Sequence, residues 1–369
     1  MQLKASAAAP LAAALALPLA PAQADTAPED GRISFKLLDY RERQPGADRV
    51  QVQAPALSVL VPLGSRWSTT ATLVYDTISG ASPAYHSTAL TPLKDLRRAL
   101  DVSISRYFDD ATLTLGAGRS VESDYRSTVA SVQLGVSSAD RNTTWTAGVA
   151  GTADRIDAGS GAIADPRKRS ASALVGLTRV LSAHDVVQLN LGAVRLRGYL
   201  SDPYKVFDAR PRARDQHTLM LRWNHHLESI GGTLRTSWRA FSDTWGVRAH
   251  TLAAEFQQPL GAGWSLTPIL RLHDQGAARF YVDADPSTEP FAPNPPPDAV
   301  FFSEDQRLSA FGARTLGLKL AWQLDTDWTA DIKLEHYAQR GSWRWLGTGS
   351  PGLAPFSARS VQFGLARRF

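Results

Sequence analysis

The 369-residue sequence predicts an all-β fold, a transmembrane antiparallel up-and-down β-barrel of about 16 strands. Three observations predict it. Apolar and polar residues alternate along most of the chain, short and long connections between these segments follow each other in order, and the last segment ends in Phe369. An even number of crossings returns both termini to one side of the membrane, which for a secreted chain is the periplasm.

Residues 1–24 have the features of a cleaved signal peptide. Lys4 is the only charged residue, an Ala/Leu/Pro run follows it, and Ala22-Gln23-Ala24 forms a small-x-small cleavage motif. A transmembrane helix is disfavoured because prolines interrupt the apolar run, which is also too short to span a bilayer. We therefore expect residues 25–369 to form the barrel, in the outer membrane of a Gram-negative bacterium.

Composition agrees with export and argues against several other classes of protein. The sequence has no cysteine, which excludes disulfides and thiolate metal sites. Its ten Trp, nine Tyr and thirteen Phe could supply the aromatic girdles of a barrel. The net charge of +5 comes from basic residues spread through strands and loops without a long Lys/Arg block, so we expect no nucleic-acid partner.

The alternation has the period of two that is typical of strands with two different faces. Leu316, Leu318 and Leu320 alternate with Gly317 and Lys319, for example. A basic side chain at mid-strand would cost roughly 2–4 kcal/mol in lipid, so such residues should face a wet lumen. The expected strands are 32–44, 49–62, 66–77, 95–108, 111–122, 127–138, 143–156, 168–182, 185–199, 214–228, 232–243, 248–259, 263–274, 306–324, 328–340 and 358–369.

The connections between these segments are alternately short and long. Asp109-Asp110 and Ala183-His184-Asp185 are examples of the short ones, and they carry residues that tight turns favour. The long ones include 157–167 and the Pro-rich 275–304, which could be a plug or an exposed cap. A transmembrane barrel predicts this order, with short periplasmic turns and longer outside loops, whereas a soluble sandwich gives no reason for it.

The final strand has the pattern with which many outer-membrane barrels end. Phe363, Leu365 and Phe369 fall on one side of it, and polar or small residues fall on the other. We interpret these three residues as the signal that barrel-insertion machinery reads. The alternative is an edge strand of a soluble sandwich that happens to end in Phe.

Several short motifs resemble a known family. These are Asp76–Pro83 (Asp-x-Ile-Ser-Gly-Ala-Ser-Pro), Glu122–Ser127, Asp140–Thr144 and Ala54–Leu57. Together with the terminal Phe they resemble the outer-membrane family of unknown function DUF 3570. The resemblance implies an outer-membrane barrel. It also implies genes beside those for a periplasmic flavin transferase, a thioredoxin-like protein and a small lipoprotein, and hence redox partners, but it supplies no catalytic residue.

The motif 76–83 is expected to open the second long loop, with Asp76, Ser79, Gly80, Ser82 and Pro83 as its candidate functional residues. Its glycine among hydroxyl residues would permit a tight backbone whose amides bind an anion, or a loop that folds into the lumen as a constriction. The preferred alternative is a turn in which Asp76 and Ser79 form local caps.

A second expected loop, Glu122–Ser127, has mixed charge. Its candidates are Asp124, Tyr125 and Arg126. We prefer a structural tie between loops to a merely solvated segment.

Lumen charge is a further signal. Arg222, Arg271, Lys319 and Arg368, together with Arg235 and Arg239, are candidates to point inward, and inward carboxylates such as Asp331 and Glu255 are fewer. A basic lumen would favour anionic solutes. Alternatively, these residues pair with carboxylates across the wall and stiffen the barrel.

Enzyme and metal motifs are not recognisable. His225 and His226 would point to opposite faces of a strand, and neither a His-x-x-x-His helix motif nor a Gly-x-Ser-x-Gly elbow occurs. We therefore expect no catalytic residue, metal or cofactor. Three functions stay open: a non-enzymatic pore or conduit, a scaffold for an extracytoplasmic flavin- or thioredoxin-linked redox system, and a surface enzyme with a loop-borne site.

Overall fold

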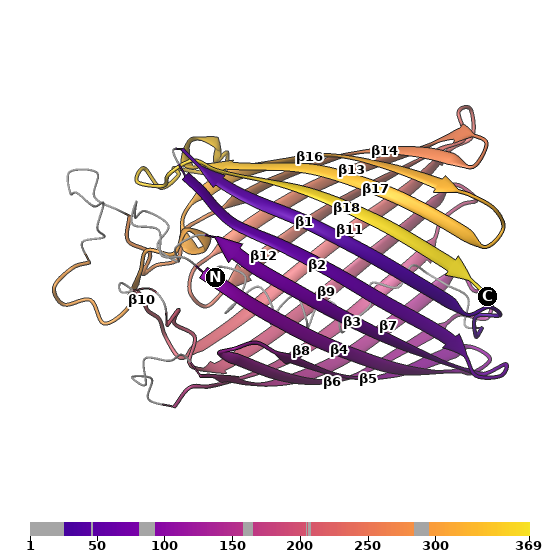
Figure 1. The fold of residues 1–369 in the computed structure, drawn as a ribbon, viewed down its shortest axis with the longest axis horizontal. Coiled ribbons are helices and arrows are strands. Elements are labelled where there is room, and N and C mark those ends of the chain that lie inside the picture. The colour runs from indigo at the N-terminus through magenta and orange to yellow at the C-terminus, as the bar shows by residue number, and fades with distance from the viewer. Residues whose placement is uncertain are drawn as a thin grey trace.

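The computed structural model describes residues 26–45, 47–80, 93–157, 165–203, 205, 208–283 and 295–369. Sixteen strands form one closed antiparallel barrel, in which β1 pairs with both β2 and β18. The strands run obliquely along its length, short turns join them at the end where the C-terminus lies, and the long connections gather at the opposite end (Figure 1). The fold class predicted from the sequence is confirmed, and the soluble sandwich is excluded.

The wall and its connections have the following bounds. The wall strands are β1 (Arg32–Gln44), β2 (Ala47–Pro62), β3 (Trp67–Gly80), β4 (Leu93–Tyr107), β5 (Ala111–Val121), β6 (Tyr125–Ser137), β7 (Thr143–Ile156), β8 (Arg167–Val180), β9 (Asp185–Gly198), β11 (Ala213–Leu227), β12 (Gly232–Asp243), β13 (Arg248–Gly261), β14 (Trp264–Gln275), β16 (Phe311–Gln323), β17 (Trp328–Arg340) and β18 (Phe356–Arg368). The long connections contain the short strands β10 (Asp208–Ala209) and β15 (Phe302–Ser303) and the 3₁₀ turns η1 (Gln306–Leu308) and η2 (Gly341–Trp343). None of the described helical turns is long and apolar enough to cross a membrane.

The expected strand 306–324 is too long at its start, and this part of the prediction is wrong. Residues Gln306–Leu308 form η1, and β16 begins only at Phe311. The side chain of Asp305 accepts a hydrogen bond from the backbone N–H of Arg307 and so caps the start of the 3₁₀ turn. Leu308 is apolar like the residues of the strand that follows, so the sequence pattern there resembled a strand. In the structure Leu308 packs with residues of the other loops.

The expected loop 76–83 is also wrong over its first half. β3 continues to Gly80, where it pairs with Leu93 of β4. Asp76 is therefore a wall residue and not a turn cap, because it lies opposite Arg97 and forms an ion pair with it at 3.3 Å. Likewise β6 begins at Tyr125, so the third loop is shorter than Glu122–Ser127. The side chains of residues 78–80 and all of residues 81–92, including Ser82 and Pro83, lie outside the described residues, as does the expected signal peptide.

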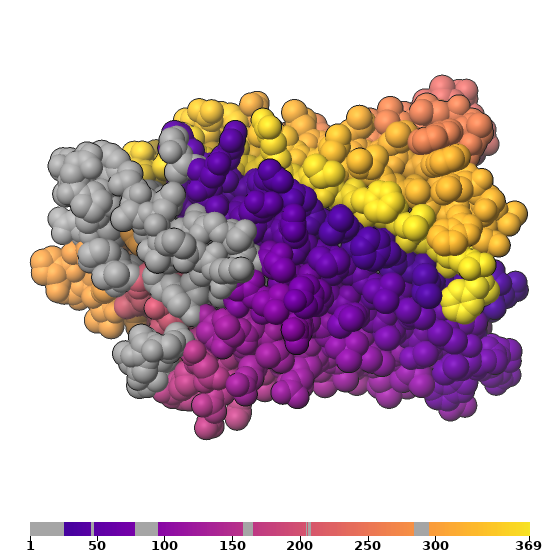
Figure 2. All heavy atoms as spheres, in the orientation of Figure 1, coloured from indigo at the N-terminus to yellow at the C-terminus, as the bar shows by residue number. Residues whose placement is uncertain are grey.

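Each wall strand has an apolar outward face. Leu316 and Leu318 of β16 are 55% and 43% exposed, and Gly317 and Lys319 alternate with them on the inward face. Register continues the face from strand to strand, since Leu318 lies opposite Leu334 of β17, and Leu334 lies opposite Val361 of β18. Side chains cover the wall as a continuous surface (Figure 2). This band is the lipid-contacting surface of the barrel.

Tryptophans mark the short-turn end of the apolar band. Trp264 and Trp322 are register partners whose rings stack at 4.9 Å. Arg106 lies over Trp67 at 5.1 Å, and other outward tryptophans at this end are Trp145, Trp223 and Trp328. Indole rings with a polar edge favour the interface between acyl chains and headgroups, so this girdle fixes the periplasmic boundary of the membrane.

The C-terminus lies at the seam that closes the barrel. Phe369 and Gly31 exchange two backbone hydrogen bonds, at 2.8 and 3.0 Å. A Cβ atom on Gly31 would come within 2.5 Å of the Phe369 ring, so the glycine leaves room for it. Phe363 and Leu365 lie farther along β18, opposite Leu37 and Phe35 of β1. A role of these residues in insertion stays a prediction.

We predict that Leu221→Arg will destabilise the barrel, because Leu221 is an outward residue near the middle of β11. The expected loss is roughly 2–4 kcal/mol, the cost of an arginine at the bilayer midplane. Urea unfolding in lipid vesicles measures it. The matched control is Asn224→Arg on the same strand, which lines the lumen. An equal loss in both variants would contradict the assignment of the faces.

We also expect Phe369→Ala to lower the yield of folded barrel several-fold when it is expressed with its export signal, because both the insertion signal and the seam contact to Gly31 are weakened. The heat-modifiable band on a detergent gel reports the yield. Phe301→Ala, in an outer connection, is the control, and equal yields from the two variants would refute the role of Phe369.

Candidate functional site

The lumen carries a basic wall on β11–β14. Arg222, Arg235, Arg239 and Arg271 all belong to the inward-facing sets of their strands, and Glu255 is the carboxylate among them. Arg235 donates to Gln257 at 2.9 Å and lies opposite Glu255 in register. We use "basic wall" for the four arginines. Sequence reasoning named all four, because each occupies a polar position of an alternating strand.

A polar cavity adjoins the basic wall on its lumen side. Its volume is about 520 Å³. Inward-facing residues of five neighbouring strands line it, among them Gln188, Arg222, Asn224, Arg235, Ser237 and Glu255. The guanidinium groups of Arg222 and Arg235 therefore border space that a hydrated solute could occupy.

Carboxylates lie on the opposite side of the barrel. In the closed order of 16 strands, β3 and β12 are eight places apart, as are β4 and β13, so each pair faces across the lumen. Asp76 pairs with Arg97, which also donates to Ser120 at 3.1 Å, and Asp101 lies inward on β4 opposite Gly118. A side chain at 118 would collide with the Asp101 carboxylate, since a Cβ atom there would lie 2.1 Å from its Oδ1.

Two other candidates for the lumen have partners. Lys319 lies 3.8 Å from Asp331 on β17, so much of its charge is balanced within the wall. Arg368 lies at the short-turn end, 3.6 Å from Asp30. Neither belongs to the basic wall.

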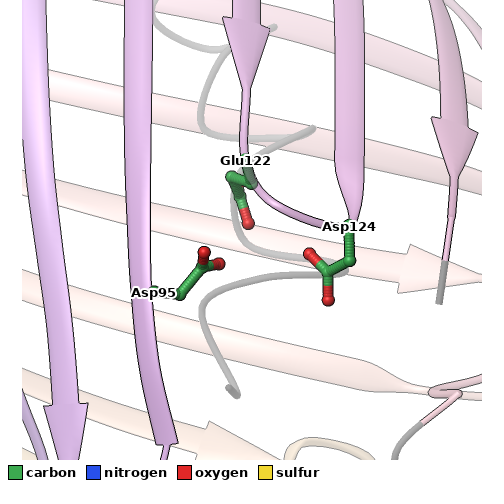
Figure 3. Close-up of side chains that lie close together, drawn as sticks. All are labelled: Asp95, Glu122 and Asp124. Carbon is green, nitrogen blue, oxygen red and sulfur yellow. The ribbon is translucent and has the colours of Figure 1, made fainter. Parts of the chain in front are cut away.

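Three carboxylates converge at the long-loop end of β4–β6. Asp95, Glu122 and Asp124 have carboxylate oxygens within 4.8 Å of one another and point toward a common centre (Figure 3). Ser123 donates to Asp95 at 2.8 Å, which links the β5–β6 connection to the start of β4. Oxygen ligands of this kind suit a hard divalent cation. Sequence reasoning named Asp124 but missed Asp95, which only strand pairing brings near it.

The other two candidates of that loop point apart. Tyr125 faces inward and accepts a hydrogen bond at 3.0 Å from Lys168, whose amine lies 3.2 Å from Asp154. Lys168 and Asp154 are almost completely buried, as a matched pair. Arg126 lies on the outward face, opposite Arg155 of β7. The sequence motif therefore divides between the two faces of the wall.

The long connections pack together as a loop layer, by which we mean the described parts of 199–212, 244–247, 276–310 and 341–355. Trp245, Val247, Ala278 and Leu308 form one buried apolar cluster within it. Loop residues also contact inward-facing wall side chains, since Gln275 donates to two loop carbonyls and Gln339 donates to Gln306. Residues 306–309, which follow the 275–304 connection, thus contact the inward face of the wall at the lumen mouth.

Asp305 is the ionic centre of the loop layer and is completely buried. Arg210 bonds to it at 2.7 Å and to Asp208 at 2.9 Å, while Arg307 donates to it at 2.9 Å. Burial alone would raise the pKa of the Asp305 carboxyl, but Arg307, Lys205 and Arg210 hold that pKa well below its usual value. Sequence reasoning missed this cluster, because nothing local pairs residue 210 with residue 305.

A closed 16-strand wall with an apolar outward band, a tryptophan girdle and a polar lumen defines an outer-membrane β-barrel. The chain belongs to the DUF3570 family of proteins of unknown function, whose sequence profile matches residues 4–92 and 85–360. No curated protein matches the chain.

Solved structures similar to the chain include outer-membrane proteins. A "Bacterial polysaccharide outer membrane secretin" is 10% identical, with 92% of this chain and 98% of that chain covered and a TM-score of 0.52. CdiB from Acinetobacter baumannii is 9% identical, with 90% and 60% covered and a TM-score of 0.48. Pseudomonas aeruginosa OccK2 (OpdF), in complex with glucuronate, is 10% identical, with 94% and 100% covered and a TM-score of 0.46. The similarity to the secretin supports the fold of the chain and nothing beyond the fold.

We predict that Asp305→Asn will open the loop layer locally. The neutral side chain leaves Arg210 and Arg307 without their shared carboxylate, and removing one partner of a buried ion pair costs about 3–5 kcal/mol. Amide hydrogen exchange of residues 303–310 in micelles measures the loss, with Asp298→Asn, an exposed change in the same connection, as control.

The same pair has a defined pH dependence. The folded-state pKa of Asp305 is depressed from 3.8, so its stabilisation is complete above the unfolded pKa and is lost as the pH falls toward the folded value. The wild type should therefore lose protection of 303–310 below about pH 4, and the Asn variant should lack this acid step. An identical acid step in both proteins would exclude Asp305 as its origin.

Proposed function

We propose that this protein is a non-enzymatic outer-membrane pore that conducts small solutes, with a preference for anions. The observation that carries the proposal is the basic wall beside the polar cavity inside a closed barrel of 16 strands. Barrels of 16 to 18 strands are wide enough to leave an aqueous channel. The loop layer would then narrow the outer mouth on the side of β14–β17 and select solutes by size.

The arrangement of charge supports the preference for anions. On the lumen face of β11–β14 the four arginines of the basic wall accompany Glu255, and the further pair Arg214–Asp243 lies at the long-loop end. On the opposite side Asp76 is paired with Arg97. An anion about 4 Å from one guanidinium gains roughly 1 kcal/mol in bulk water and up to about 4 kcal/mol at the effective dielectric constant of a protein surface. An anionic solute would therefore pass along the basic wall. The Asp76–Arg97 side would repel it only weakly, because the Asp76 carboxylate is paired with a guanidinium.

The two alternatives have less structural support. A scaffold for periplasmic redox proteins would need a docking surface on the periplasmic side, where the described connections between strands are short turns. A surface enzyme would need titratable residues gathered in the loops with a substrate cleft. The clustered groups of the loop layer are instead buried in ion pairs.

We predict stepwise conductance of the purified barrel in planar bilayers, with anions more permeant than cations. The double variant Arg222→Gln/Arg271→Gln should lower the anion-to-cation permeability ratio about fivefold, since each charge contributes of the order of 1 kcal/mol or less. The reversal potential in a potassium chloride gradient measures the ratio.

The control for this experiment is Arg179→Gln, an exposed outward arginine near the short-turn end of β8. A barrel that is folded but electrically silent would overturn the pore itself. A conducting barrel whose selectivity is the same in the wild type and the double variant would overturn only the role of the basic wall.

A further inference from the structure

The outward surface of β6–β9 carries a concentration of arginines at the long-loop end. Arg126 lies directly opposite Arg155, which lies opposite Arg167 on the next strand. One step toward the membrane, Arg169 lies opposite Arg197. We call the exposed residues Arg126, Arg155, Arg167, Arg169, Arg195 and Arg197 the arginine patch.

Such a row needs a physical explanation, because like charges directly opposite each other on neighbouring strands destabilise a sheet. Few carboxylates of the described residues form ion pairs with these arginines, and two of those carboxylates each pair with two arginines. Asp215 serves both Arg197, at 2.6 Å, and Arg195, at 3.7 Å, while Asp165 serves Arg167 at 4.0 Å and also Arg212. Among the described residues Asp157 is the third, at 2.7 Å from Arg155. The intervening segment 158–164 contains no charged residue in its sequence.

The arginine patch borders the apolar band. On β8 the outward residues after Arg169 are Ala171, Ala173 and the 51% exposed Val175. Two residues of a strand span about 7 Å, so the guanidinium groups lie at the level of lipid headgroups, on the membrane side opposite the tryptophan girdle. They face the outer leaflet.

An apolar groove lies beside the arginine patch on the same outward surface. It spans β8 to β13, has a volume of about 560 Å³, and is shallow because Ala173, Ala193 and Ala240 form much of its floor. His217 and Arg248 lie at its border, at the end nearest the loops. We call it the outer groove. It crosses five strands and contributes two or three residues from each, on the surface that faces the acyl chains of the leaflet.

We propose that the arginine patch and the outer groove together bind a phosphorylated, multiply acylated lipid of the outer leaflet. The guanidinium groups hold its phosphates, since the planar fork of arginine matches phosphate oxygens in bidentate fashion. The outer groove takes one of its acyl chains. A bound polyanion also offsets the repulsion along the row Arg126–Arg155–Arg167. This proposal is independent of the pore.

The choice of a lipid over a soluble anion rests on position. The arginine patch adjoins a lipid-facing groove, and a free phosphate would gain nothing from Ala173 or Ala193. A lipid gains from both, through charge at the headgroup and through buried acyl surface. Both contributions can be removed separately by substitution.

The test uses the full-length barrel in a zwitterionic detergent and native mass spectrometry with four probes. These are bisphosphorylated lipid A, the same glycolipid without phosphates, phosphatidylglycerol, and inorganic phosphate. The wild type should bind the bisphosphorylated glycolipid at least tenfold more tightly than each of the other three. Equal binding of the dephosphorylated glycolipid, of phosphatidylglycerol or of inorganic phosphate would overturn the proposal.

Three variants assign the contributions. Arg126→Gln/Arg167→Gln/Arg169→Gln should weaken binding at least tenfold, whereas Arg106→Gln/Arg179→Gln/Arg367→Gln, with the same charge change at the short-turn end, should leave it unchanged. Ala193→Phe fills the outer groove and should weaken binding of the acylated lipid several-fold without altering the charge. Heat modifiability verifies folding of each. Unchanged binding in both the patch variant and the groove variant, or equal losses in the two triple variants, would refute the assignment.

Discussion

Closure of the wall is the constraint on which the rest of this structure depends. Acyl chains offer no hydrogen-bond partner, so every backbone amide and carbonyl at membrane depth must bond within the protein. Pairing of β1 with β18 removes the two edges that 16 strands in an open sheet would leave. Pro55 is a local exception, since register pairs between β2 and β3 are interrupted at Ala54 and Pro55, where the proline supplies no N–H donor.

Once the wall is closed, the period of a strand sorts the side chains into a lipid face and a lumen face. This explains why mid-strand charges such as Arg222 and Arg239 are tolerated, and why the outward Leu221 can lie directly before Arg222 in the sequence. It also explains Gly118, because the Asp101 carboxylate from β4 and the Val129 side chain from β6 occupy the lumen-side space that a side chain there would need. The fold thus determines that the lumen is polar. One side of the lumen is basic because the strands on that side carry inward arginines.

The local sequence pattern predicted the strands of the wall and the arginines that face the lumen, but not the clusters that distant segments form. Alternation located all 16 strands, because each strand has its own polar and apolar faces whatever its partner. It ended β3 early at Thr77, three residues before Gly80, and treated Asp76 as the start of a loop motif although Arg97 lies opposite it in the wall. It began β16 early, and it could not join Asp305 to Arg210 or Asp95 to Asp124, since those contacts depend on how distant connections pack. The sequence therefore predicts faces well and clusters poorly.

Arginine occurs in three environments in this barrel, and each environment implies different chemistry. Arg210 is buried with Asp208 and Asp305, so its charge is consumed in holding two loops together. Arg222 borders a cavity where water and solutes can reach it, so its charge is available to the lumen. Arg126 and Arg169 face outward at headgroup level, where anionic groups of the leaflet can supply a counter-charge. The net charge of +5 consequently says little about partners until each guanidinium is assigned to loop layer, lumen or leaflet.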